Sequence, residues 1–136
     1  MKRASVCFMR SSESRNVAIG QPCEFDVVHC EGPGLRAASV GNGVHVRESG
    51  TYRIEVRGYV LPMAPGDIGV CVAPSPCSES VRELCTVMVP CESVRATSIA
   101  GVLAVVPCKA GSVVSLSFER AGTLLAGASL AVTRVT

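Results

Sequence analysis

The amino-acid sequence predicts an all-β fold, an antiparallel β-sandwich of jelly-roll type with about eight to ten strands. Valine is the first reason: the chain has 22 valines and 8 leucines, and β-branched side chains favour strands over helices. The second reason is that short apolar runs alternate with glycine and proline turns at close spacing. The third is a period of two in residues 52–57, which is typical of a strand with one buried face.

Residues 51–60 are the clearest strand. Tyr52, Ile54 and Val56 alternate with charged residues, so the apolar side chains are expected on one face. A single helical turn is expected near residues 78–84. The other strands are expected at residues 17–19, 25–28, 44–47, 68–73, 85–89, 99–106, 113–118 and 128–135.

The predicted strand at residues 99–106 carries no polar side chain on either face. A strand of an antiparallel sandwich usually shows one face to water, so the second apolar face needs a cover. The final strand, residues 128–135, is nearly as apolar. Two such strands in one sheet would form an exposed patch too large for a monomer, and another copy of the same chain is the natural cover.

Composition excludes several classes of protein. With 136 residues, 48% hydrophobic and 18% charged, the chain has the size and composition of one folded domain. A net charge of +2, five aromatic residues and no tryptophan do not suit a nucleic-acid binder. No apolar run is long enough for membrane insertion, and residues 1–12 lack the core of a signal peptide. We therefore expect synthesis in the cytoplasm without a signal peptide.

Eight cysteines are a high number for a chain of this length. No Cys-x-x-Cys pair occurs, so zinc ribbons and thioredoxin-type redox motifs find no support. Three interpretations stay open: buried free thiols, disulfides, and a metal cluster. The repeated spacing Cys71-x5-Cys77 and Cys85-x5-Cys91 makes these four residues the candidates for a disulfide or a cross-link.

Residues with catalytic or metal-binding patterns are not found. His29 and His45 are the only histidines. A metal-binding jelly roll would need a second histidine two residues after His45, and the cation Arg47 stands there instead. There is no nucleophile elbow and no glycine-rich loop leading into a helix. We therefore expect a non-enzymatic protein with no catalytic residue, no metal ligand and no cofactor.

Three segments resemble the jelly roll of the tumour necrosis factor and complement globular-head family. They are Val-Arg-Glu-Ser-Gly-Thr-Tyr-Arg-Ile at residues 46–54, Lys-Ala-Gly-Ser-Val-Val-Ser-Leu at 109–116, and the closing strand at 128–135. Ser112 stands where the family usually has aspartate. The resemblance covers residues 15–136 and leaves residues 1–14 as an N-terminal arm. It is closest to the C-terminal domain of bacterial collagen-like surface glycoproteins, such as those of exosporium filaments.

This resemblance implies a homotrimer in which the outer face of one sheet surrounds a threefold axis. In the family's strand order the sixth and last strands belong to that sheet, and the strands at 99–106 and 128–135 fall at those places. The charges of residues 51–60 would make the interface mixed rather than wholly apolar. The interface residues expected on this basis are Arg53, Glu55, Arg57, Tyr59, Leu103, Val105, Ala131 and Val135.

The resemblance leads to three hypotheses of function. The first is a trimeric structural or adhesive module of a bacterial spore or cell surface, with itself, other surface-layer proteins or glycans as partners. The second is the receptor- or glycan-binding tip of a phage fibre or a lectin-like domain. The third is a metal- or thiol-dependent enzyme, which would need bound metal or one unusually reactive thiol. Specific ligand binding separates the second from the first, and metal analysis with thiol titration tests the third.

Overall fold

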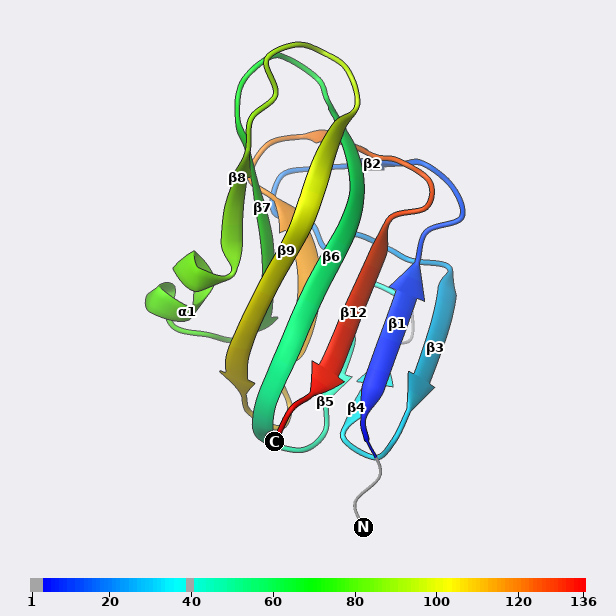
Figure 1. Cartoon of the computed structure of the whole chain (residues 1–136), viewed down its shortest axis with the longest axis vertical. Coiled ribbons are helices and arrows are strands. Elements are labelled where there is room, and N and C mark those ends of the chain that lie inside the picture. Colours follow the sequence, from blue (N-terminus) through cyan, green and yellow to red (C-terminus); the bar gives the residue numbers. More distant parts are fainter. Residues whose placement is uncertain (1–3, 39–40) are drawn as a thin grey trace.

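Two antiparallel β-sheets packed face to face make up the protein (Figure 1), as the sequence predicts. The computed structural model describes residues 4–38 and 41–136, except the side chains at positions 100, 102 and 103. The described residues form twelve strands and one short helix. The strands are β1 (Val6–Arg10), β2 (Arg15–Val17), β3 (Val27–Glu31), β4 (Leu35–Ala37), β5 (Val44–Val46), β6 (Gly50–Pro62), β7 (Ile68–Ser75), β8 (Thr86–Val89), β9 (Thr97–Cys108), β10 (Val113–Phe118), β11 (Gly122–Leu124) and β12 (Ser129–Arg134), and the helix is α1 (Glu79–Leu84).

Strands distant in sequence are neighbours in both sheets. The larger sheet has the order β2-β11-β6-β12-β1-β3. β12 and β11 pair with successive parts of one edge of β6, and β9 pairs with its opposite edge. The smaller sheet has the order β4-β5-β10-β7-β8. The first strand therefore lies beside the last, and the start of β1 and the end of β12 lie at the same end of the sandwich (Figure 1). This antiparallel pairing of distant strands is the jelly-roll arrangement.

β6 runs the length of the larger sheet and follows the predicted alternation. Tyr52, Ile54 and Val56 are fully or almost fully buried, whereas Arg53 and Arg57 are exposed. The strand is longer than predicted because it continues through a bulge at Gly58 to pair with β11. The positive φ of Gly58 (152°) lets the backbone pass close to Ala128.

The core lies between the two sheets and takes inward side chains from both. Leu116 and Phe118 of β10 belong to the same buried cluster as Tyr52 and Ile54 of β6. The Tyr52 hydroxyl donates a hydrogen bond to the backbone oxygen of Glu48 over 2.6 Å. The buried ring therefore keeps its polar end satisfied, as a buried tyrosine requires.

The structure corrects the boundary at residue 14. Residues 4–14 are not a separate arm, because they contain β1, which lies between β12 and β3 in the larger sheet. β1 shows no polar alternation, because Cys7 and Met9 are buried while Val6 and Phe8 occupy the other face. Its pairing with two strands distant in sequence holds it in the sheet.

Other predicted strands are displaced or were missed. The strand expected at 17–19 lies at Arg15–Val17, and the one expected at 25–28 lies at Val27–Glu31. β4 and β11, of three residues each, were not predicted, since strands this short leave too few positions for a period of two. The helical turn is confirmed as α1: the Ser78 hydroxyl caps it by accepting a hydrogen bond from the Val81 N–H.

Candidate functional site

The outer face of the larger sheet gathers most of the residues expected at an interface. We call this surface the assembly face. β6 supplies Arg53, Glu55, Arg57 and Tyr59, β9 supplies Val105 and β12 supplies Ala131, and β1 adds Phe8.

The strand register sets which of these residues are neighbours. Phe8 lies opposite Ala131, which in turn lies opposite Glu55, so the three form a row across β1, β12 and β6. Arg53 lies opposite Val105 of β9. Val135 follows β12 directly, is exposed, and is tied to β6 by a hydrogen bond from its N–H to the Thr51 oxygen over 2.7 Å. Leu103 pairs with Glu55, and its side chain lies outside the described residues.

A line of three charged side chains runs along β6. Glu55 accepts from Arg57 Nε over 2.6 Å, and its other oxygen lies 3.5 Å from Arg53. The Glu55 side chain is 23% exposed, against 55% for Arg53 and 76% for Arg57. Side chains at i and i+2 share one face of a strand, so β6 itself aligns the three groups. One carboxylate is therefore held between two guanidinium groups, which leaves the line with a single positive charge.

Apolar side chains flank this line of charges. Tyr59 is 54% exposed and Val105 57% exposed, and Phe8 is also exposed. The two-faced apolar character expected of residues 99–106 is seen in β9, where Ala104 and Val106 are buried while Val105 between them faces outward. Phe8 is not among the interface residues expected from the sequence, because residues 1–14 were expected to form an N-terminal arm. Apolar residues at both odd and even positions of Val6–Arg10 were the pattern that could have indicated a strand with two apolar faces.

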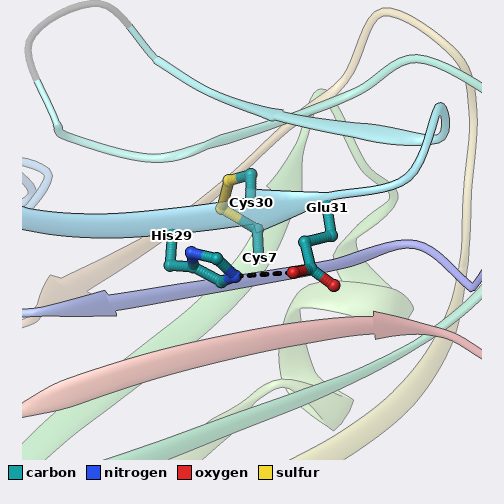
Figure 2. The surroundings of a disulfide bond; sticks show 4 residues. All are labelled: Cys7, His29, Cys30 and Glu31. Atoms are coloured by element: carbon teal, nitrogen blue, oxygen red, sulfur yellow. Dashed lines mark hydrogen bonds and ion pairs between the residues drawn. A yellow bond between two sulfur atoms is a disulfide. The ribbon is translucent and has the colours of Figure 1, made fainter.

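The edge of the larger sheet is closed by a disulfide. Cys7 of β1 and Cys30 of β3 lie directly opposite each other, with their Cα atoms 4.1 Å apart (Figure 2). β3 has no buried side chain, so the bond to Cys7 fixes a strand that packing alone would hold weakly. Beside it, His29 and Glu31 form an exposed pair over 3.0 Å.

The structure bonds a different cysteine pair from the one that the spacing suggested. Cys71, Cys77, Cys85 and Cys91 have free thiols, so no disulfide forms among them. Equal spacing did not identify partners, because β1 and β3 are brought together by sheet register and not by sequence distance. A cross-link from these thiols to another chain stays a prediction.

Burial changes the acidity of several free thiols. It raises the pKa of Cys23 to about 12. It also raises the pKa of Cys85 and of Cys108 to about 11, with smaller contributions from neighbouring thiols. These thiols are protonated at neutral pH and behave as small apolar side chains, the first of the three interpretations of the cysteines.

The histidines do not belong to a ligand cluster. His29 pairs with Glu31, and His45 lies in β5 opposite Arg36 on one side and Val113 on the other. Within residues 4–38 and 41–136, no group of three or more His, Cys, Asp or Glu side chains is arranged to hold a metal ion. In the same part of the chain, no helix has the length and apolar character needed to cross a membrane.

The fold defines the class of this domain: it is a jelly roll of the tumour-necrosis-factor-like type. Two sheets with the order described above superpose on Eiger TNF from S. frugiperda with a TM-score of 0.73 at 17% identity, covering 98% of this chain and 94% of that one. Murine APRIL at pH 8.5 gives a TM-score of 0.67 at 17% identity, covering 98% and 100% of the two chains.

A third similar structure is a vertex protein. The PRD1 vertex protein P5 matches with a TM-score of 0.56 at 14% identity, covering 100% of this chain and 99% of that one. No protein-family model matches the sequence. No curated protein matches it either. At these identities the likeness shows the fold alone.

Proposed function

We propose that the chain is a non-enzymatic, homotrimeric module that assembles through the assembly face and serves a structural or adhesive role. One observation carries this proposal: Phe8, Tyr59 and Val105 stand exposed on one sheet face around a carboxylate already neutralised by two arginines. Exposed apolar groups that gather on one face of a soluble domain indicate a protein interface.

The line of charges on β6 suits burial at such an interface. A buried carboxylate without a partner would cost several kcal/mol, whereas Glu55 already has Arg53 and Arg57 beside it. Arg57 is largely exposed and remains available to a partner. Each apolar side chain covered in the trimer would contribute about 1 kcal/mol, roughly half the value for full burial, because each is already about half covered in the single chain. Apolar groups would thus provide affinity, and the charges would set the register.

The setting we propose is a bacterial spore or cell surface. The sequence resemblance to collagen-like surface glycoproteins supports this setting. The free thiols support it as well, since Cys77 is exposed and can cross-link a surface layer after assembly. Other surface-layer proteins or glycans would then be the further partners.

The proposal is tested by native mass from light scattering on a size-exclusion column, with and without reductant. We expect a mass near three times 14.1 kDa in both conditions. Val105→Glu puts a charge in the proposed interface and should give monomers that keep the β-sheet spectrum. Met88→Glu is the matched control, since Met88 is a similarly exposed apolar residue on a strand of the other sheet and should leave the trimer intact. A monomeric parent protein would refute the assembly.

A receptor- or glycan-binding tip is the second candidate. The full-length similarity to the PRD1 vertex protein P5 favours it, because the match covers nearly all of both chains. The test is a glycan array probed with the native oligomer. Saturable binding to one glycan class, with a dissociation constant of about 10 μM or lower, would move the assignment to recognition.

A further inference from the structure

Cys77 occupies an unusual place among the free cysteines of the described chain. It lies between the end of β7 and the Ser78 cap of α1, and it is exposed, whereas the other free cysteines that the structure describes are buried. Two pockets meet at this residue, because Cys77 belongs to the lining of both. A thiol in this position is accessible from two sides.

The first pocket, of about 530 Å³, lies over the outer face of the smaller sheet. The residues of β10 and β7 that line this pocket are small, which leaves space above the sheet. Ser115 lies opposite Ala73, and Ser117 lies opposite Cys71. Cys71 is 2% exposed and forms no hydrogen bond through its thiol among the described residues. Arg82 of α1 borders the same pocket and gives its lining a positive charge.

The second pocket, of about 420 Å³, lies on the other side of Cys77. Val81 and Pro107 give it apolar walls, and the buried Cys108 and the exposed Lys109 complete it.

The charged side chains that line these two pockets are both cations, while Glu79 and Glu83 border Arg82 in a separate pocket. Within the described chain, neither the Arg82 nor the Lys109 side chain has a salt-bridge or hydrogen-bond partner, and each lies on a different side of Cys77. Two cations in pockets that serine residues also line suit a small ligand that carries carboxylate groups.

We propose that Cys77 is a covalent modification site for a small anionic disulfide, which leaves one of its halves attached to the protein. In this exchange the Cys77 thiol gives its proton to solvent, and the thiolate attacks one sulfur of the small disulfide. The new bond joins Cys77 Sγ to that sulfur. The old sulfur–sulfur bond breaks, and the other half leaves as a thiolate with the electron pair. Cys77 is oxidised, and the departing sulfur is reduced.

The nearby buried thiols favour persistence of this mixed disulfide. Two of these neighbours, Cys85 and Cys108, could release the attached group only by attacking it as thiolates. Burial raises the pKa of both to about 11, so little of either is ionised at neutral pH. A disulfide from Cys77 to either of these two thiols should therefore form slowly.

The test uses oxidised glutathione, a disulfide with several carboxylates, on the native full chain without reductant. Intact mass spectrometry and peptide mapping should find one glutathionyl group per chain, located on Cys77. Cys77→Ser should remove the adduct. The double variant Arg82→Gln/Lys109→Gln should slow the reaction with oxidised glutathione several-fold, but not the reaction with the uncharged 2-hydroxyethyl disulfide.

Three results would overturn the proposal. The adduct could form at another cysteine, or the Arg82→Gln/Lys109→Gln variant could react with oxidised glutathione as fast as the parent protein does. The protein could instead form a Cys77–Cys108 disulfide, seen as an intact mass lower by two hydrogen atoms, and carry no adduct. Cys77→Ser and the charge variants alter exposed side chains, and an unchanged far-UV spectrum with an unchanged thermal midpoint verifies that they fold.

Discussion

At the scale of single residues, Tyr52 shows how one side chain joins the core to a turn. Its ring is fully buried in β6, and its hydroxyl reaches back to the oxygen of Glu48 four residues earlier. A second, longer contact of 3.4 Å reaches the oxygen of Gly34 in the turn before β4. The residue therefore links the larger sheet to the loops that enter both sheets.

Removing that hydroxyl should weaken the fold without disturbing its packing. Tyr52→Phe is expected to lower the free energy of unfolding by about 1 kcal/mol, because a nearly buried hydrogen bond is lost and the ring is kept. Tyr59→Phe is the control on the same strand, since Tyr59 is exposed. Urea unfolding of both variants gives the comparison, and equal values would show that the Tyr52 hydroxyl does not contribute.

The buried thiol of Cys23 should make stability depend on alkaline pH. Burial raises its pKa from 9.0 to about 12, so the folded state keeps a proton that the unfolded chain loses above pH 9. This contribution is complete below pH 9 and falls as pH rises toward 12, by at most about 1.4 kcal/mol per pH unit.

Urea unfolding between about pH 8 and pH 10.5 measures that slope. Cys23→Ala should flatten it, whereas Cys77→Ser, which replaces an exposed thiol, should leave it unchanged. Cys85 and Cys108 contribute a decline in the same direction that persists in both variants. Identical slopes in the parent and Cys23→Ala would contradict the assignment.

At the scale of elements, the bulge in β6 decides how the larger sheet is built. Gly58 lets β6 bend, so that the strand pairs with β12 along its first part and with β11 at its end. A Cβ atom at this position would lie 2.8 Å from the Cβ of Ala128, which is itself buried. Both the positive φ and this close approach require glycine here.

Gly58→Ala should therefore cost about 2 to 4 kcal/mol of unfolding free energy, through steric overlap and backbone strain together. Gly101→Ala separates the two effects. Gly101 also has a positive φ of 54°, but a Cβ there meets nothing within 4 Å, so only about 1 kcal/mol is expected. Chemical denaturation of both variants measures the difference. Similar losses would show that contact with Ala128 is unimportant.

At the scale of the whole molecule, assembly should be visible in thermal stability. A trimer that dissociates on unfolding gains stability with protein concentration, so the midpoint of unfolding should rise when the protein is concentrated. Val105→Glu should remove this dependence, because it places a charge on the assembly face. Scanning calorimetry over a hundredfold range of concentration makes the measurement. A midpoint that stays constant for the parent protein would contradict the proposed trimer.

Strands with a regular period were predictable from the sequence. β6 and β10 have buried residues at every second position, and both lie close to where the alternation places them. The apolar residues on both faces of β9 predict an interface on the outer face of its sheet without reference to strand pairing. β1 was not predicted because two of its outward side chains, Val6 and Phe8, are apolar, and only Arg10 at its end marks the period.

The class of fold and most of the residues on one outer surface follow from the amino-acid sequence alone, because side-chain periodicity is a local property of a strand. The arrangement in space adds that Phe8 joins Glu55 and Ala131, that Cys7 bonds Cys30, and that Cys77 lies between two pockets. The physical reason is that these relations depend on register between strands far apart in the chain. Register is set by the packing of both sheets together, and no local pattern specifies it.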